Sequence, residues 1–264
     1  MSGMPPAPNI GNKPSMTAHP SSASTVDPRE VARFSQLSEQ WWDPKGKMKP
    51  LHQINPLRLA YIRDAACRKF DRNPKSLNCL AGLRILDIGC GAGLLCEPLT
   101  RLGAEVVGVD PSETNIAVAK LHAERGHLTI DYRCTTIEEM DPRERFDIVL
   151  AMEVVEHVAD VGLFLDRCAA LQKPSGMMVV ATLNRTWKSF ALAIVGAEYI
   201  LRWLPRGTHQ WDKFVTPAEL THHLERNKLA VSEQAGVVYN PLADKWSVSS
   251  DMDVNYMVIA EAAI

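Results

Sequence analysis

The sequence predicts an α/β protein built on an open, mostly parallel sheet with a Rossmann-like alternation of strands and helices. Residues 85–88 (Ile-Leu-Asp-Ile) form a short apolar run that is typical of a buried strand. Three alternate glycines (Gly89, Gly91, Gly93) follow this run, and leucines then resume at helical spacing. A second strand pattern over residues 105–110 ends in an acid. Strand, glycine turn, helix and strand in this order are typical of the first ligand-binding unit of such a sheet.

The spacing of the glycines and of the acid indicates whether the site would bind a dinucleotide or another nucleoside ligand. A dinucleotide site needs G-x-G-x-x-G, and Leu94 occupies the position of its third glycine. The observed G-x-G-x-G is the form found in class I S-adenosylmethionine (SAM) methyltransferases. Asp110 lies 21 residues after Gly89, where a carboxylate can accept hydrogen bonds from both ribose hydroxyls. Together these features favour a SAM site at Gly89, Gly91 and Asp110 over a purely structural turn.

Composition bounds the class of protein. The chain has 264 residues, of which 46% are hydrophobic and 23% charged, which suits one globular domain with a real core. Its net charge is −2, so no global basic field is present to hold nucleic acid, and no nucleic-acid partner is expected. The six cysteines include no C-x-x-C pair, which favours reduced thiols over a disulfide frame or a zinc site.

The chain is expected to divide into a tail and one domain. Residues 1–26 are rich in small and polar residues without hydrophobic periodicity, which is typical of a disordered tail. Residues 27–264 are expected to form a single domain. Its first helix is predicted to begin at Asp27, because Asp as the N-cap, Pro28 at the first position and Glu30 at the third make a strong helix start.

A second helix is predicted with Asn55 as its cap and Pro56 at its first position. Arg58 then lies near the helix start, where a cation gains nothing from the helix dipole. Two interpretations of Arg58 stay open. It is either a solvated arginine or a guanidinium that is held over the glycine loop and binds the carboxylate of SAM's methionine part.

The remainder of the chain completes an expected sheet of seven strands. Beyond the first two, the predicted strands cover residues 128–133, 146–152, 177–182, 231–239 and 255–260, with helices at 115–123 and 161–171 and a further helix from Pro217. The strand at 146–152 is strongly apolar and is therefore expected at the centre. Met152 at its carboxyl end then lies in the ligand crevice, where it either fills core or contacts the adenine or the sulfonium.

The residues directly after this strand are the candidates for chemistry. Glu153, Glu156 and His157 stand at i, i+3 and i+4, so a helical turn would place all three on one face. His157, with Glu153 beside it, could act in catalysis as the general base that removes a hydroxyl proton. Alternatively, the three side chains could hold a divalent cation such as Mg²⁺ that lowers the hydroxyl's pKa. The structural interpretation is a solvated acidic turn with a hydrogen-bonded histidine.

A segment at about residues 187–210 is predicted to be an inserted amphipathic lid. Its apolar part, residues 190–204, has a longest uncharged stretch of eight residues, far short of the roughly 20 that a membrane span needs. Trp187 and Trp203 lie near its ends with basic residues nearby, a pattern typical of an element that lies at a membrane surface. An ordinary lid over the pocket is the alternative.

From residue 34 to residue 260 the chain resembles the ubiquinone biosynthesis O-methyltransferases. The family-specific segments that carry the resemblance are Trp41-Trp42-Asp43, Gly196-Ala197-Glu198-Tyr199 and Pro205-Arg206-Gly207-Thr208-His209. The motifs Leu86-Asp87-Ile88-Gly89-Cys90-Gly91 and Met152-Glu153-Val154-Val155-Glu156-His157 agree with it. One departure is Pro174-Ser175-Gly176, where Pro-Gly-Gly is usual; it lies in an expected turn away from the site.

The resemblance implies a fold, a reaction and a set of contacts. The fold is the seven-stranded, mostly parallel sheet of class I SAM methyltransferases with N-terminal helices. The reaction is O-methylation of polyprenylated hydroxyphenols and demethylubiquinol. The family's SAM contacts fall on Arg58, Gly89, Asp110 and Met152, and a magnesium-type site of the eukaryotic relatives maps onto Glu153, Glu156 and His157.

The resemblance also implies a place and partners. The family is peripheral to the membrane, which implies the cytoplasmic face of the bacterial inner membrane or, alternatively, the matrix side of the mitochondrial inner membrane. Its partners would be the prenylated substrate, the lipid surface and other ubiquinone-biosynthesis enzymes.

Other classes of function compete with this one. A dehydrogenase is disfavoured by Leu94, and an amino-methylating nucleic-acid enzyme by Leu183-Asn184-Arg185 where Asn-Pro-Pro-Tyr would stand. A non-catalytic SAM-binding scaffold and a methyltransferase for another small catechol stay open.

Overall fold

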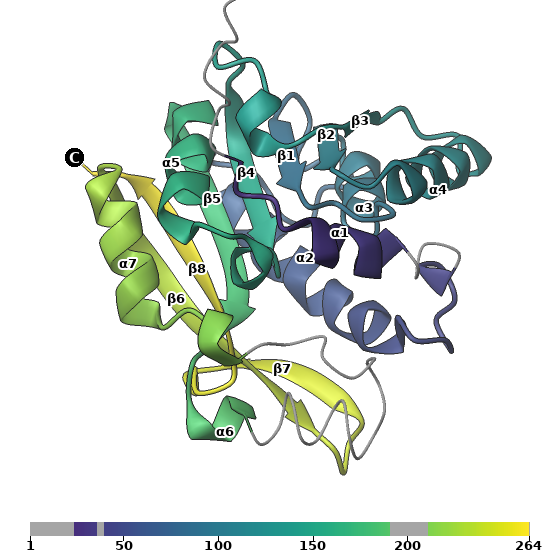
Figure 1. Ribbon diagram of the computed structural model, residues 1–264. Helices are drawn as coiled ribbons and strands as arrows, with labels where there is room; N and C mark the ends of the chain where they lie inside the picture. Colours follow the sequence, from purple (N-terminus) through teal and green to yellow (C-terminus); the bar gives the residue numbers. More distant parts are fainter. Residues whose placement is uncertain (1–23, 36–39, 191–210, 264) are drawn as a thin grey trace, which may run out of the picture.

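The computed structural model describes residues 24–35, 40–190 and 211–263. Their strands form an eight-stranded sheet in the order β3-β2-β1-β4-β5-β8-β6-β7 (Figure 1). The strands are β1 (Arg84–Ile88), β2 (Glu105–Asp110), β3 (Asp131–Cys134), β4 (Phe146–Met152), β5 (Gln172–Leu183), β6 (Leu229–Asn240), β7 (Lys245–Ser249) and β8 (Asn255–Ala262). The five strands from β3 to β5 pair in parallel, and β8 pairs antiparallel with both β5 and β6.

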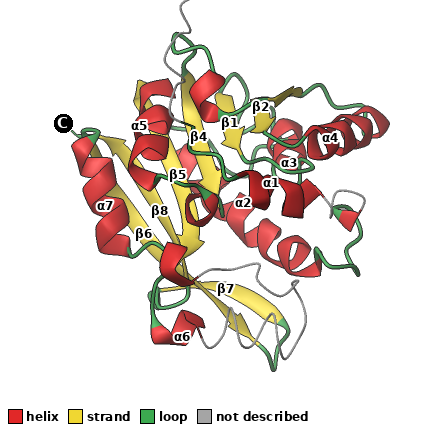
Figure 2. Cartoon of the chain, viewed as in Figure 1, coloured by secondary structure: helices red, strands yellow, loops and turns green. Residues whose placement is uncertain are grey.

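Helices cover both faces of this sheet (Figure 2). They are α1 (Pro28–Ser35), α2 (Lys49–Lys69), α3 (Cys96–Arg101), α4 (Glu113–Arg125), α5 (Val161–Leu171), α6 (Trp187–Ser189) and α7 (Pro217–Arg226), with 3₁₀ turns η2 (Ile137–Glu139), η3 (Val155–His157) and η5 (Trp211–Lys213). Strand β4 is buried along its whole length. Ile148 and Leu150 pack into the core under α2, α3 and α4, whereas Val149 packs into the core under α5 and α7. The prediction of a central, apolar β4 is confirmed.

The predicted fold class is confirmed, but the predicted number of strands is wrong. The eighth strand is β7, which pairs antiparallel with β6 through contacts such as Val237↔Val248. Its side chains are exposed or half-buried, and Val248 is 51% exposed. An edge strand of this kind buries too little apolar surface to produce the alternating pattern by which strands are found in a sequence.

The second helix begins earlier than predicted. Helix α2 starts at Lys49 with Pro50 in its first turn, and Pro56 lies inside it. A proline inside a helix removes one backbone hydrogen bond, but the buried side chains of Ile54 and Ile62 hold this helix against the sheet on both sides of the proline. Arg58 therefore lies in the body of the helix and not near its start.

Two further boundaries differ from the prediction. Residues 24–26 fall in the predicted tail, yet Thr25 is buried and Val26 forms a bridge with Val158. Strand β5 begins at Gln172, so the segment expected to be a turn, Pro174-Ser175-Gly176, lies inside the strand next to a register irregularity in β4. The start of α1 is confirmed, since the Asp27 carboxylate accepts a hydrogen bond from the Arg29 amide.

Most of the predicted lid, residues 191–210, lies outside the described residues. At its near edge, Trp187 stacks on Trp211 with ring centroids 5.5 Å apart, and Phe190 packs edge-on to Trp187. In residues 24–35, 40–190 and 211–263, no helix has the length and apolar character of a membrane span.

Candidate active site

The glycine loop between β1 and α3 takes the conformation that its sequence predicts. Gly89 and Gly91 have φ values of +67° and +54°, a region that side chains with a Cβ rarely adopt. A Cβ on Gly91 would lie 2.6 Å from the ring of Trp41, and one on Gly89 would lie 2.7 Å from Val154. Trp41 and Val154 thus close over the loop, and only glycine fits beneath them.

Asp110 is held rigidly at the end of β2. Its Oδ2 accepts a hydrogen bond from the Gly91 amide at 3.0 Å, and its Oδ1 accepts from the Ser112 amide at 2.9 Å and from Asn115 Nδ2 at 3.2 Å. Burial raises the pKa of this carboxyl, although all three hydrogen bonds oppose the shift. Asn115 in turn accepts a hydrogen bond from Trp41 Nε1. The carboxylate that was predicted to bind ribose is therefore fixed against the glycine loop.

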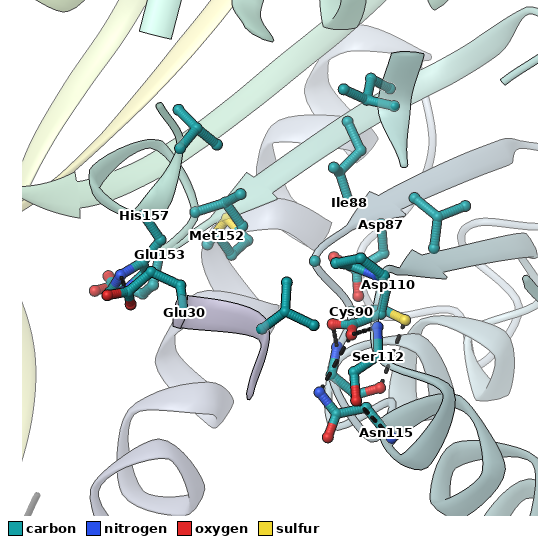
Figure 3. Close-up of a pocket in the computed structure, with 18 of the residues that line it drawn as sticks. Glu30, Asp87, Ile88, Cys90, Asp110, Ser112, Asn115, Met152, Glu153 and His157 are labelled. Atoms are coloured by element: carbon teal, nitrogen blue, oxygen red, sulfur yellow. Dashed lines mark hydrogen bonds and ion pairs between the residues drawn. The ribbon is translucent and has the colours of Figure 1, made fainter. Parts of the chain in front are cut away.

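A cavity of about 280 Å³ lies at the carboxyl ends of β1, β2 and β4. Figure 3 shows polar side chains gathered at two places in it: Asp110, Ser112 and Asn115 at one, and Glu30, Glu153 and His157 at the other. Met152 lies at the end of β4, lines the cavity and also packs in the core. One side chain thus borders both the core and the crevice, and its contact with the adenine or the sulfonium stays a prediction.

Arg58 is buried, which overturns the interpretation of a solvated arginine. Only 4% of the residue is exposed, and it lines the cavity from α2. Its Nη2 donates a hydrogen bond to Glu153 Oε1 at 2.5 Å. Its Nε is buried and has no hydrogen-bond partner among the described residues. An unsatisfied buried donor on a charged group costs free energy, which makes Arg58 suited to receive an anion from the cavity.

The acidic turn after β4 does not place its three side chains on one face of a helix. Glu153 has a φ of +59°, and only residues 155–157 form a 3₁₀ turn. As a result Glu153 faces Arg58, whereas the buried Glu156 accepts a hydrogen bond from Thr182 Oγ1 at 2.7 Å. Burial raises the pKa of Glu156 well above its usual value, and the nearby Glu153 charge adds to the shift.

His157 faces a residue that the sequence did not indicate as functional. Its Nδ1 lies 2.9 Å from Oε2 of Glu30 in α1, and both side chains are almost entirely buried. The described residues contain no group of three or more His, Cys, Asp or Glu side chains arranged to hold a metal ion. The donor set predicted for Mg²⁺ therefore does not fit a cation in this arrangement, because Glu153 is engaged by Arg58 and Glu156 by Thr182.

Three features of the site are not predicted from the sequence: Glu30, Asn115 and the contact of Trp41 with the glycine loop. Glu30 is predicted only as part of a helix start, and this pattern does not indicate a partner elsewhere in the chain. Trp41 stood in a family-specific segment, but nothing in its spacing placed it over Gly91. Asn115 carried no signal.

Comparison with known proteins identifies the family. Residues 58–234 match the family described as Methyltransferase domain. A ubiquinone biosynthesis O-methyltransferase of Rhodopseudomonas palustris (strain BisB18) is 80% identical over 92% of this chain and 95% of its own length. The chain belongs to the ubiquinone biosynthesis O-methyltransferases. A second member of this family, from Bradyrhizobium sp. (strain ORS 278), is 79% identical over 91% of this chain and 95% of its own length.

Solved structures of more distantly related proteins share the fold of this chain. Magnesium protoporphyrin IX methyltransferase from Synechocystis PCC 6803, with bound SAH, aligns with a TM-score of 0.63 at 16% identity, over 88% of this chain and 95% of that chain. An S-adenosylmethionine-dependent methyltransferase from Clostridium acetobutylicum aligns with a TM-score of 0.60 at 10% identity, over 88% of this chain and all of that chain. At these identities the likeness concerns the fold.

Proposed function

We propose that this protein transfers the methyl group of SAM to phenolic hydroxyls of polyprenylated hydroxyphenol and demethylubiquinol intermediates in ubiquinone biosynthesis. The names of relatives that are about 80% identical over nine-tenths of the chain support the reaction and the pathway. The observation that carries the proposal is the cavity itself. Asp110, whose carboxylate can accept hydrogen bonds from ribose hydroxyls, lines it at one place. His157, which can accept a hydroxyl proton, lines it at another.

SAM occupies the cavity with its nucleoside toward Asp110. The Asp110 carboxylate accepts hydrogen bonds from the ribose hydroxyls, and Gly89 and Gly91 allow close approach of the ligand because they carry no Cβ. The methionine carboxylate pairs with Arg58, whose buried Nε lacks a partner among the described residues. Met152, at the end of β4, lies against the adenine or the sulfonium.

His157 is the general base in this proposal. An unperturbed phenol has a pKa near 10, so it is a weak nucleophile at neutral pH until its proton is removed. His157 takes this proton, the phenolate oxygen attacks the SAM methyl in line, and the carbon–sulfur bond breaks to release SAH. Positioning of the two reactants supplies much of the rate. Glu153 takes part by holding the guanidinium of Arg58 at the methionine end of SAM.

The proposed mechanism does not use a magnesium ion. The carboxylates that would hold it have other partners, Arg58 for Glu153 and Thr182 for Glu156. A carboxyl with a raised pKa, such as that of Glu156, is also a poor cation ligand while it is protonated.

We also infer that the protein works at a membrane surface, on the cytoplasmic face of the inner membrane. A polyprenylated substrate partitions into lipid, and Trp187 is 77% exposed at the edge of the predicted lid, beside Phe190. Other ubiquinone-biosynthesis enzymes are proposed as neighbours there. Sedimentation with anionic vesicles tests this location: the wild type should co-sediment, and Trp187→Ala should do so more weakly. Equal sedimentation of the two would exclude this aromatic edge as a membrane contact.

Methyl transfer from labelled SAM to a farnesylated catechol in vesicles tests the reaction. We expect turnover by the wild type and a loss of about 10²- to 10⁴-fold in kcat for His157→Ala, the usual contribution of a general base. Wild-type protein that binds SAM but transfers no methyl group would support the non-catalytic scaffold. Transfer to a simple catechol as fast as to the farnesylated one would favour a methyltransferase for another small catechol.

A further inference from the structure

The N-terminal helix contributes a carboxylate to the candidate active site. Glu30 lies on α1, more than a hundred residues before His157 in the sequence, and its Oε2 is 2.9 Å from His157 Nδ1. The exposed fractions of the two side chains are 10% and 15%. Figure 3 shows Glu30 beside His157 and Glu153 at the edge of the cavity. A carboxylate this close to an imidazole nitrogen, and this well shielded from water, interacts with it far more strongly than an exposed pair does.

The segment that carries Glu30 is fixed on both sides of this contact. Val26 forms a β-bridge with Val158, and the Ala159 amide donates a hydrogen bond to the Thr25 carbonyl at 2.7 Å. The Thr25 amide donates to Glu138 Oε1 at 2.9 Å, and both residues line the cavity. The N-terminal segment thus contacts the residues that directly follow His157. These contacts fix the position of α1 relative to the histidine.

A second contact anchors the start of the helix. Lys213 Nζ lies 3.1 Å from Asp27 Oδ2, and both side chains are about one-quarter exposed. Asp27 also accepts the Arg29 amide at 3.0 Å. Because these contacts fix α1 without Glu30, the Glu30 carboxylate is not needed merely to hold the helix in place.

We propose that Glu30 is the positioning residue for the base His157. This inference rests on the proposed function, in which His157 removes the phenol proton. With the Nδ1 proton donated to Glu30, the neutral imidazole is held in the tautomer whose Nε2 lone pair can accept a proton. The same contact fixes the orientation of the ring.

The carboxylate acts again when the proton moves. The phenol O–H bond breaks and an Nε2–H bond forms, which leaves an imidazolium beside Glu30. The negative charge of Glu30 stabilises this cation, as the buried aspartate does in a Ser-His-Asp triad. The phenolate then takes the methyl group from the sulfonium, and SAH leaves with the sulfur electron pair. His157 returns its proton to solvent, so the cycle balances without any other reactant.

Two substrates distinguish this role from a structural one. One is a farnesylated catechol, whose hydroxyl must lose its proton during the reaction. The other is the same compound with a ring nitro group, which makes the hydroxyl acidic enough to be ionised in the assay buffer. A variant that lacks only the positioned base should be slow on the first and nearly normal on the second. A variant with a disturbed fold should be slow on both.

The variants are Glu30→Ala and Glu30→Gln, with Arg29→Ala as the exposed control on the same helix. For Glu30→Ala we expect kcat on the catechol to fall about 10- to 100-fold, with KM for SAM within about twofold and the nitro substrate affected less than about threefold. Glu30→Gln should lie between Glu30→Ala and the wild type, because the amide oxygen can still accept the Nδ1 proton but carries no charge. Arg29→Ala should behave as the wild type.

Three outcomes would overturn the inference. These are wild-type kcat on the catechol for both Glu30 variants, equal losses on the two substrates, and a weakened affinity for SAM that accounts for the loss. His157→Ala separates this failure from failure of the proposed function. If His157→Ala loses turnover while Glu30→Ala does not, only the role of Glu30 fails; if His157→Ala keeps full turnover, the base itself is misassigned.

Discussion

Replacing Arg58 by glutamine separates its contribution to the fold from its contribution to SAM binding. Arg58 and Glu153 form a close pair in which 5% and 22% of the side chains are exposed. Loss of one partner of a fully buried pair costs about 3–5 kcal/mol. Because Glu153 is one-fifth exposed and can be partly hydrated, we expect Arg58→Gln to lower the free energy of unfolding by about 2 kcal/mol.

The effect on the cofactor is expected to be independent of this loss. A hydrogen bond to a charged group is worth about 1.5–3 kcal/mol, and each 1.4 kcal/mol corresponds to about tenfold in affinity. If Arg58 binds the methionine carboxylate, Arg58→Gln should weaken SAM binding about 10- to 100-fold. Urea unfolding measures the first quantity and isothermal titration calorimetry the second.

A double variant provides the decisive comparison. Arg58→Gln/Glu153→Gln removes both charges, so it should recover most of the lost stability while SAM binding stays weak. Arg143→Gln, which breaks the exposed pair with Asp141, should change neither quantity. The reasoning would be refuted if Arg58→Gln bound SAM with wild-type affinity. It would also be refuted if the double variant regained that affinity together with its stability.

Further predictions concern Gly91 of the glycine loop, Asp87 of β1 and the acidic turn after β4. Gly91→Ala should weaken SAM binding and destabilise the fold by about 1–3 kcal/mol more than Gly82→Ala, since both have positive φ but only Gly91 faces the Trp41 ring; titration calorimetry and urea unfolding measure both effects. Burial raises the pKa of Asp87 to about 7 from 3.8, so the folded state binds more protons than the unfolded state between about pH 4 and pH 7, and stability falls as pH rises through this window. Asp87→Asn should remove this fall, by up to about 4 kcal/mol in urea unfolding at about pH 8 compared with about pH 4. Turnover should persist in EDTA; a loss that Mg²⁺ restores would show that Glu153 leaves Arg58 when substrate binds.

The cofactor end of the site could be predicted from the sequence because its geometry is local. A strand, three alternate glycines and an acid at the end of the next strand leave little freedom for the chain between them. Gly89, Gly91 and Asp110 accordingly lie together, as the spacing predicts. Met152 could be placed for the same reason, since a residue at the carboxyl end of a central parallel strand must face the crevice.

The reacting end could not be predicted in the same way, because tertiary contacts override its local signals. Pro56 indicated a helix start, yet the packing of α2 carries the helix through it and places Arg58 against Glu153. The i, i+3, i+4 spacing of the acidic turn predicts one shared face only if the turn is helical from its first residue. The positive φ of Glu153 breaks that condition. Glu153 pairs with Arg58 and Glu156 with Thr182, although the two carboxyls still interact, and His157 pairs with Glu30.

The extent of the matched methyltransferase domain suggests why the reacting end depends on such contacts. The match covers residues 58–234, which include Asp110, Met152 and His157, whereas Glu30 and Trp41 precede it. The matched residues of this chain supply Asp110, Met152 and His157, but not the carboxylate that lies against His157. In this chain the N-terminal segment lies over the cavity and supplies the carboxylate at His157. The specific chemistry is thus expected to depend on the residues outside the shared domain.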